Sequence, residues 1–265
     1  MKILVFMKQV PDTAAPISVK DNQVDASKID KYAASPYDEY ALEQALQIKD
    51  KAADTKITLV TLGPARVREM IMQGLAMGAD DAVIIKHEPA KHGELVEPND
   101  LDGLAVANVL AAAAKKIGYD LIYTGTKGVD DDQGWVGIAM GELLGLPLVA
   151  GARSTEVSGG TARVLRDVEG GKEKLEVSLP ALITSSQATE PRYPTLKGIM
   201  GAKRKPVLEW DIASLGVAAD ALASRVERVA LDMPPGRQAG RLLLGEPNDQ
   251  VQELVRLLRE QAKVI

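Results

Sequence analysis

Short apolar runs alternate with helix-like segments along most of the chain, and this alternation limits the possible folds more than any other feature. Runs that are apolar on both faces are typical of parallel strands buried between two layers of helices. Five runs are found, of which the first four are almost continuously apolar: Ile3–Met7, Ile57–Leu62, Ala82–Ile85, Leu121–Thr124 and Ala181–Thr184. We therefore expect strands at these five places.

Four helices are predicted between the strands. Pro36–Asp50 follows Ser35 as its N-cap and has proline at the first helical position and acidic residues in the first turn. The other three each end at a glycine, which suits the residue after a helix: Ala65–Met77, Asn99–Ile117 and Trp135–Leu144. Strands alternating with helices predict an α/β fold with a doubly wound, mostly parallel sheet.

Two further parts depart from this alternation. Residues 152–177 alternate polar with apolar side chains around two glycine pairs, which predicts an antiparallel hairpin or meander added to the sheet. After about Val207 the pattern changes again, and the chain closes with a predicted helix at Asn248–Ala262. We expect an α/β domain at 1–207, with a loop at 190–205, and a C-terminal extension at 208–265.

Composition excludes several classes of protein. The chain has 265 residues, a net charge of −5 and no cysteine, which argues against a general nucleic-acid binder and excludes disulfides and thiol chemistry. No stretch of eighteen apolar residues is present, so we expect no direct membrane insertion and a cytoplasmic location. His87 and His92 are the only histidines, and Pro89 between them speaks against a helical metal site.

The segment Leu121–Gly137 is the best candidate for a ligand site. It runs from the carboxyl end of a predicted parallel strand to the start of a helix, where open α/β sheets bind their ligands. Its glycines allow backbone N–H groups to approach a phosphate, whose charge the helix dipole favours. The acidic triplet Asp130–Asp132 would repel a phosphate, so we expect it to cap the helix or bind ribose hydroxyls. A capped turn without a ligand explains this segment equally well.

Glu190–Met200 is a stiffened segment with an apolar residue that no core pattern explains. Pro191 and Pro194 fix their own φ and favour extended geometry in the residues before them, which predicts a rigid loop that carries Leu196. A rigid apolar tip suits docking, because little ordering entropy remains to be lost on binding. From physics alone, a loop whose leucine packs onto its own domain is the somewhat better interpretation.

Several motifs together resemble the beta subunit of electron-transferring flavoproteins. Glu-Pro-Arg-Tyr-Pro-x-Leu-x-x-Ile-Met at Glu190–Met200 is similar to that family's recognition loop, and Asp167–Glu173 followed by Leu179-Pro180-Ala181 is similar to its signature. Further matches occur in the same order as in the family, over nearly the whole chain: Lys8–Asp12, Ser35–Glu43, Leu75–Asp80 and Pro234–Gly240. Several motifs in order are far more specific than any one of them.

The resemblance implies a fold and a function. The fold would be adenine-nucleotide-hydrolase-like, with the antiparallel hairpin as an excursion and the C-terminal extension as an arm around an alpha subunit. The chain would be an electron carrier subunit and not an enzyme, passing electrons through FAD between dehydrogenases and a downstream acceptor. Its partners would be the alpha subunit, acyl-CoA-type or other flavin dehydrogenases, and a quinone reductase or similar acceptor; membership of an electron-bifurcating complex stays open.

The resemblance also implies which residues bind cofactors and partners. The redox FAD would lie mainly in the alpha subunit, covered on one side by the loop from Val10 to Thr13, Tyr37 and Arg166. AMP or a second FAD would bind within this chain, at Phe6, Ser35, Pro36, Tyr37, Asp38, Leu62, Gly125, Asp130, Asp132, Gln133, Gly134, Trp135, Val136 and Gly137. Val136, Gly137 and Pro194 favour the second FAD, whereas Trp135 matches neither variant, so both stay open. Leu196 would anchor the partner dehydrogenase, together with Tyr193, Ile199 and Met200.

A stand-alone, stress-type regulatory protein that binds a nucleotide on the same fold is the alternative. The fold itself does not separate the two functions. The recognition loop and the arm favour the flavoprotein subunit, because a self-sufficient sensor needs neither.

Overall fold

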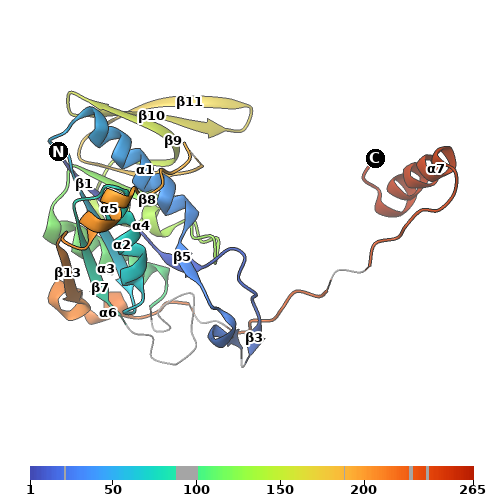
Figure 1. Cartoon of the computed structure of the whole chain (residues 1–265), viewed down its shortest axis with the longest axis horizontal. Helices are drawn as coiled ribbons and strands as arrows, with labels where there is room; N and C mark the ends of the chain where they lie inside the picture. The colour runs from blue at the N-terminus through green and yellow to red at the C-terminus, as the bar shows by residue number, and fades with distance from the viewer. Residues whose placement is uncertain (21, 88–100, 188, 227–228, 237–238) are drawn as a thin grey trace. The chain divides into compact units, whose positions relative to one another are not determined.

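The computed structural model describes residues 1–20, 22–87, 101–187, 189–226, 229–236 and 239–265. The chain divides into two compact units, Met1–Leu231 and Asp232–Ile265. A nine-stranded sheet forms the centre of the first unit, in the order β11-β10-β9-β12-β8-β1-β6-β7-β13 (Figure 1).

Six neighbouring strands of this sheet are all parallel, which confirms the predicted doubly wound sheet. They are β1 (Lys2–Phe6), β6 (Lys56–Gly63), β7 (Asp81–Lys86), β8 (Leu121–Gly125), β12 (Ala181–Ser185) and β13 (Val207–Asp211). Five of them match the apolar runs of the sequence. The sixth, β13, was not predicted, because it lies at the sheet edge and its side chains are exposed or half-buried.

The predicted antiparallel excursion is a meander of three strands, β9 (Leu148–Ser158), β10 (Thr161–Val168) and β11 (Gly171–Ser178). Gly159–Gly160 forms the first turn and Glu169–Gly170 the second, and Gly159, Gly160 and Gly170 have the positive φ that such turns require. The first strand starts earlier than predicted and pairs in parallel with β12. The meander therefore continues the main sheet and is no separate layer.

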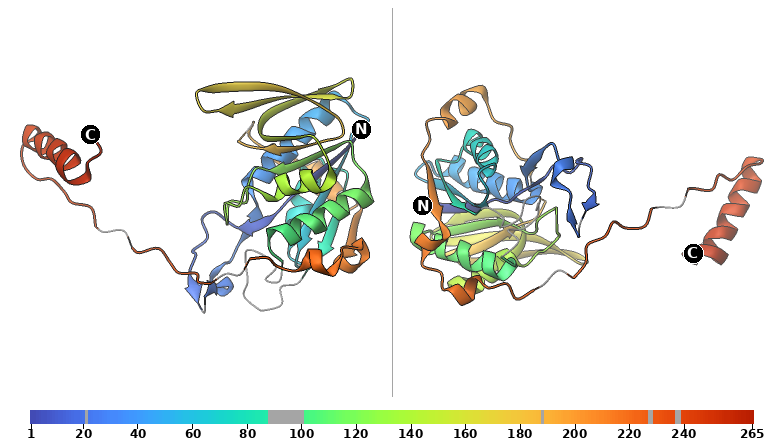
Figure 2. Two further views of the ribbon diagram at one scale, coloured as in Figure 1. Left: turned by 180° about the vertical axis from the view of Figure 1, so that it is seen from behind. Right: turned by 90° about the horizontal axis from the view of Figure 1, so that it is seen from below.

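Helices cover both faces of the sheet, as Figure 2 shows. On one face α1 (Pro36–Lys51) and α2 (Val67–Met77) form a core with alternate residues of β1, such as Val5. On the other face α3 (Gly103–Ile117) and α4 (Val136–Leu144) form a second core with the intervening residues, such as Leu4. Alternation of side chains along a strand explains why one strand serves both cores.

Helix starts depend on caps that the sequence pattern located only in part. Ser35 occupies the N-cap position of α1, as predicted, but its side chain makes no capping hydrogen bond. The third helix begins at Gly103 and not at Asn99, because Asp102 caps it by accepting hydrogen bonds from the N–H groups of Leu104 and Ala105; Asn99 itself lies outside the described residues.

The stiffened segment is a loop only as far as Thr195, so the prediction of a loop through Met200 was wrong. Helix α5 (Leu196–Ala202) follows, because Pro194 restricts nothing beyond itself and Thr195 caps the helix by accepting a hydrogen bond from Gly198 N–H at 3.0 Å. Shorter elements complete the unit: β2 (Gln9–Pro11), β3 (Val19–Lys20), β4 (Gln23–Val24), η1 (Ala26–Lys28), β5 (Tyr32–Ala34), η2 (Ile212–Leu215) and α6 (Ala219–Leu222).

The second unit contains α7 (Pro247–Leu257), which continues as η3 (Leu258–Ala262) at the position of the predicted terminal helix. Its apolar side chains at Val251, Leu254 and Val255 are exposed, and none of the described residues of these two helical segments is buried. The boundary expected after residue 207 falls at the start of β13, within the first unit. No helix among the described residues is long and apolar enough to cross a membrane.

Candidate functional site

The site lies where the direction of the chain's winding changes. From β1 the chain proceeds through α1 to β6 on one side, and it later returns through α3 to β8 on the other side. A crevice opens at the carboxyl ends of the strands at such a point. Here it is a cavity of about 1130 Å³, its open mouth included, and pockets of several hundred Å³ hold small-molecule ligands.

One wall of the cavity is apolar and the opposite side is polar. The apolar side chains come from the strand ends and from α3 and α4: Phe6, Val60, Leu62, Val106, Leu110, Val136 and Met140. The cationic side chains of Lys8, Arg66 and Lys127 and the carboxylates of Asp38 and Asp131 line the remainder. An apolar slot beside several charges suits a ligand with a flat apolar ring and an ionic end.

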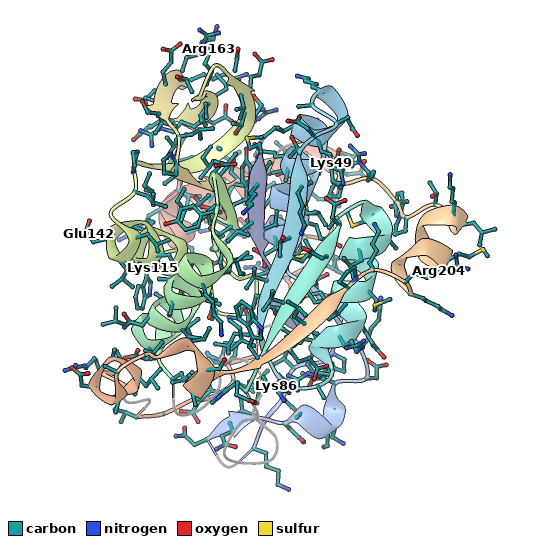
Figure 3. All side chains as sticks on the ribbon, turned by 90° about the vertical axis from the view of Figure 1, so that its left-hand side faces the viewer. Lys49, Lys86, Lys115, Glu142, Arg163 and Arg204 are labelled. Carbon is teal, nitrogen blue, oxygen red and sulfur yellow. The ribbon has the colours of Figure 1, made fainter. Side chains whose placement is uncertain are left out.

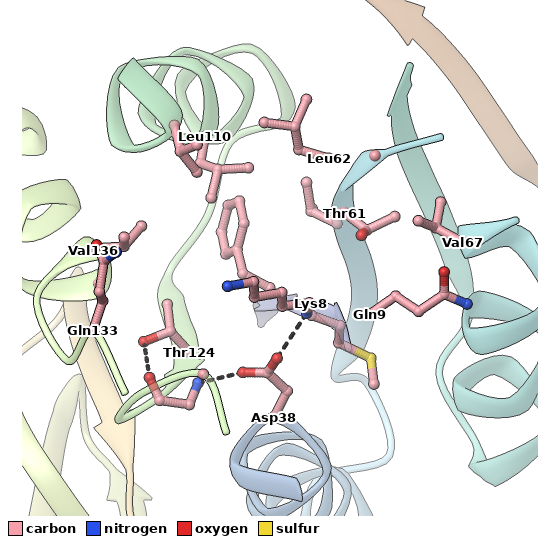
Figure 4. A pocket seen from close by; sticks show the side chains of 18 of the residues that line it. Lys8, Gln9, Asp38, Thr61, Leu62, Val67, Leu110, Thr124, Gln133 and Val136 are labelled. Atoms are coloured by element: carbon pink, nitrogen blue, oxygen red, sulfur yellow. Dashed lines mark hydrogen bonds between the residues drawn. The ribbon is translucent and has the colours of Figure 1, made fainter. Parts of the chain in front are cut away.

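Asp38, in the first turn of α1, holds the floor of the cavity together. Its carboxylate accepts hydrogen bonds from the backbone N–H of Lys8 at 2.7 Å and from that of Gly125 at 2.9 Å (Figure 4). Burial raises the pKa of Asp38 to about 7, although these two hydrogen bonds oppose the rise. The carboxylate thus joins the second residue after β1 to the last residue of β8.

Lys8 projects from the end of β1 toward two carboxylates. Its Nζ lies 3.0 Å from Asp130 Oδ2 and 2.8 Å from Asp131 Oδ2. Burial lowers the pKa of Lys8, but the two negative charges outweigh burial and raise it overall. Burial is also the main reason that the pKa of Asp130 is raised, since its side chain is 4% exposed; the positive charge of Lys8 opposes the rise.

The acidic triplet does not cap the following helix, so that expectation was wrong. The N-cap position of α4 is Trp135, which makes no side-chain capping bond. Instead Asp130 and Asp131 pair with Lys8, while Asp132 pairs with Lys127 at 2.7 Å. The sequence did not show this because the lysine partner of the first two lies on a distant strand. The two lysines offset two of the three negative charges that would repel a phosphate.

Two glycines permit the close approaches that shape the cavity. A Cβ on Gly125 would collide with the Asp38 carboxylate, and one on Gly137 would collide with the Thr124 hydroxyl. Glycine at Gly125 therefore lets the carboxylate reach the backbone of β8. Glycine at Gly137 lets the first turn of α4 lie against the sheet, so that its unpaired N–H groups end beside the cavity.

The predicted nucleotide-binding residues fall into two groups. Those that line the cavity are Phe6, Asp38, Leu62, Gly125, Gln133, Val136 and Gly137. Those that do not line it flank it in sequence, at the start of α1 or in the loop before α4: Ser35, Pro36, Tyr37, Asp130, Asp132, Gly134 and Trp135.

The residues expected near the flavin of an alpha subunit lie elsewhere. Val10 is buried in β2, and Thr13 is exposed just beyond that strand. Arg166 lies on β10, where its Nε donates to Glu173 Oε2 at 2.8 Å. None of these three lines the cavity.

Several lining residues were missed by the sequence reasoning. Lys8 directly follows an apolar run, so its place at a strand terminus was available as a signal; Thr124 lies within the predicted segment Leu121–Gly137. Val106, Leu110 and Met140 come from helices, and nothing in a helical pattern tells which core-facing residue borders a cavity. His87 also lines the cavity, whereas His92 lies outside the described residues.

We use the name docking surface for four side chains of this segment, Tyr193, Leu196, Ile199 and Met200. All four side chains are exposed, Tyr193 by 92% and Leu196 by 74%. The three cations after α5 do not act alike: Lys203 and Arg204 are exposed, whereas Lys205 donates to the carbonyls of Leu75 and Ala79. The ammonium group of Lys205 is therefore engaged within the domain and does not extend toward a partner.

Comparison with known proteins adds independent information. Residues 26–215 match the model of the electron transfer flavoprotein domain. The chain is 38% identical to the electron transfer flavoprotein subunit beta of Bacillus subtilis and 36% identical to that of Bradyrhizobium diazoefficiens, over 100% of both chains in each pair. It is 34% identical to the human subunit beta over 91% of each chain.

Replacement of Asp38 by asparagine tests the joint at the floor of the cavity. An amide can accept only one of the two N–H bonds, so we expect Asp38→Asn to lower the free energy of unfolding by about 1–3 kcal/mol. The folded-state pKa of Asp38 is about 7 and lies above the ordinary value of 3.8. The free energy of unfolding of the wild-type protein therefore falls as the pH rises from 3.8 to 7, because the folded state must give up a proton that it binds more tightly than the unfolded state does. The difference between wild type and variant should therefore shrink from pH 4 to 7.

Urea denaturation at several pH values measures both effects. Glu176→Gln on β11, an exposed carboxylate, serves as the control. A constant difference between the wild type and Asp38→Asn across this pH range would contradict the assigned burial.

Proposed function

The chain belongs to the electron transfer flavoprotein beta-subunit family, and we propose that it forms a heterodimer with an alpha subunit and carries electrons from flavin dehydrogenases to a downstream acceptor. The single observation that supports this most strongly is the match to named beta subunits over the entire chain. The cavity at the strand ends adds a site of suitable chemistry. An electron carrier needs no acid, base or nucleophile of its own, because bound FAD supplies the redox chemistry.

We further propose that the cavity binds AMP or a second FAD. The residues present fit an adenine nucleotide: Phe6 and Leu110 offer an apolar slot for the ring, and Arg66 lines the cavity as a cation besides the paired Lys8 and Lys127. The N–H groups in the first turn of α4 add donors of the kind that bind anions. Asp132, which is exposed and flanks the cavity, would hold a ribose hydroxyl in this arrangement, whereas Asp130 is buried beside Lys8 and would act only through that lysine.

The interface with the alpha subunit would involve parts of the chain outside the cavity. We propose that the segment Val10–Thr13, Tyr37 and Arg166 cover one side of the redox FAD bound mainly by that subunit. Thr13 and Tyr37 are exposed or half-buried, which leaves them free to contact a partner. We also propose that the terminal helix α7 binds the alpha subunit, because its apolar side chains lack a core of their own.

The docking surface would bind the dehydrogenase. Single exposed apolar side chains are common on protein surfaces, but four of them within eight residues form a cluster of the kind that marks an interaction site. Two prolines stiffen the segment that carries them. Leu196 is the central anchor in this proposal. Lys203 and Arg204 nearby favour a partner with acidic groups around its own apolar site. A quinone reductase or a similar protein would accept the electrons afterwards.

Leu196→Ala tests the docking surface. With the heterodimer as acceptor and an acyl-CoA dehydrogenase as donor, we expect the half-saturating donor concentration to rise about tenfold, or about 1.4 kcal/mol. Flavin and nucleotide content should not change, because Leu196 lies outside the cavity. Leu143→Ala on α4 removes another exposed leucine and is the matched control. An unchanged half-saturating concentration in the Leu196 variant would refute the docking role.

Removal of the terminal helix tests the arm. A chain ending at Leu231 keeps both cores, so we expect an unchanged thermal midpoint for the isolated subunit. Co-purification with the alpha subunit should be lost or greatly reduced, because the apolar face of α7 is missing. Charged substitutions at Val251 and Leu254 in the full chain should act in the same direction. Full recovery of the heterodimer with either change would show that the arm is dispensable.

A further inference from the structure

The segment that leads to the docking surface has few ties to the body of its domain. Residues 189–195 form neither helix nor strand. Over residues 189–194, the N–H of Arg192 is the only backbone N–H that is hydrogen-bonded to another described residue. Its acceptor is not backbone but the side chain of Glu43, which belongs to α1. The backbone hydrogen bonding of this segment to the body of the domain therefore depends on one arginine.

The guanidinium group of Arg192 binds two carboxylates of α1. Its Nε donates to Glu43 Oε2 at 2.9 Å, and its Nη2 donates to Glu43 Oε1 at 3.0 Å and to Asp50 Oδ2 at 2.7 Å. The first two bonds are the paired, fork-like contact that a guanidinium makes and an ammonium does not. Glu43 and Asp50 lie two helical turns apart, so the guanidinium spans the surface of the helix.

Glu43 has its own requirement for this contact. Its side chain is 6% exposed, and a carboxylate buried this far needs a counter-charge. Among the described residues, Arg192 is the only cation within ion-pair distance of it, and Gln47 supplies one further hydrogen bond at 3.2 Å. Separation of the pair would leave the buried charge of Glu43 unpaired. The free energy of the folded protein is therefore lower when Arg192 stays bound to Glu43.

The far side of the docking surface is held independently. Helix α5 lies so close to α2 that a Cβ on Gly198 would collide with the carbonyl oxygen of Ala76. Ala202 is buried, and Lys205 donates to carbonyls at the end of α2. The tip formed by Tyr193 and Leu196 thus lies between two anchors, of which Arg192 is the upstream one.

We propose that Arg192 is a positioning residue for dehydrogenase docking, which acts by tying the chain just before Tyr193 and Leu196 to α1 through Glu43 and Asp50. The proposal rests on the docking function proposed above. A fixed tip loses little conformational entropy when a partner binds, whereas a released tip must be ordered first. Arg192 itself need not touch the partner.

Three variants of the heterodimer test the role of Arg192. Arg192→Lys keeps the charge but cannot hold both carboxylates. Glu43→Gln with Arg192→Met removes the contact and leaves no unpaired buried charge, so that the fold is preserved. Arg163→Met is the matched control, because it breaks another arginine–carboxylate contact, with Glu176 at 2.7 Å, on the hairpin. Figure 3 shows Arg163 in a different part of the domain from Arg204, which follows α5.

Two readouts separate positioning from general damage. Hydrogen exchange measures the ordering of residues 189–197 without any partner. Reduction of the heterodimer by an acyl-CoA dehydrogenase, itself reduced by its acyl-CoA substrate, gives the half-saturating donor concentration and the limiting rate. We expect the amide of residue 192, the one hydrogen-bonded amide among the described residues 189–194, to exchange about tenfold faster in the double variant. The same variant should need about tenfold more donor, with an unchanged limiting rate and flavin content. Arg192→Lys should lie between, and Arg163→Met should match the wild type.

The Leu196→Ala variant distinguishes the two ways of being wrong. If it weakens docking while the double variant does not, Arg192 has no positioning role and the docking surface stands. If neither change affects the half-saturating concentration, the docking function itself is wrong, and the proposal for Arg192 falls with it. A lower limiting rate or flavin content in the double variant, with an unchanged half-saturating concentration, would show a structural role only and would also overturn the proposal.

Discussion

The geometry of the site depends on the hydrogen bonds that the buried carboxylate of Asp38 accepts. By accepting hydrogen bonds from Lys8 and Gly125, it joins the carboxyl ends of two neighbouring parallel strands to the first turn of α1. The strand ends would otherwise present unpaired N–H groups to the cavity. The joint also requires that residue 125 has no side chain, since a Cβ would occupy the position of the carboxylate.

Helix α1 links the cavity to the docking surface. Asp38 lies in its first turn at the cavity, and Glu43 and Asp50 further along bind Arg192 at the base of the docking segment. A rise of 1.5 Å per residue places Asp38 and Asp50 about 18 Å apart along the axis. A rigid element of this kind would keep the separation between a nucleotide and a docked partner constant, and in an electron carrier the protein's contribution is largely such positioning.

The elements with strong periodic patterns were the ones that the sequence predicted. Five of the six core parallel strands and all four long helices follow from apolar runs, proline and glycine, because these report burial and chain reversal locally. Strand β13 was not predicted, because an exposed edge strand has no continuous apolar run in its sequence. Helix α5 was not predicted, because the two prolines before it indicate extended geometry. That extended geometry ends at Thr195, and the helix begins at the next residue.

The site was predictable in place but not in its contacts. A loop between a parallel strand and a glycine-rich helix start indicated the location, and Asp38 and Val136 were expected there from the family resemblance. The pairing of Lys8 with Asp130 and Asp131 joins residues more than a hundred positions apart, and no local pattern encodes it. The same is true of Arg192 and Glu43, whose contact is visible only once α1 and the docking segment are placed side by side.

The central claim is that this chain is a subunit that holds a nucleotide of its own beside the shared flavin. The most direct test is to purify the heterodimer with its alpha subunit, denature it, and quantify the released FAD and AMP. The account predicts two adenine nucleotides per heterodimer: FAD and AMP for a carrier with a single flavin, or two FAD for a bifurcating type. A heterodimer that releases only one nucleotide would show that the cavity described here is not a nucleotide site and would contradict the account.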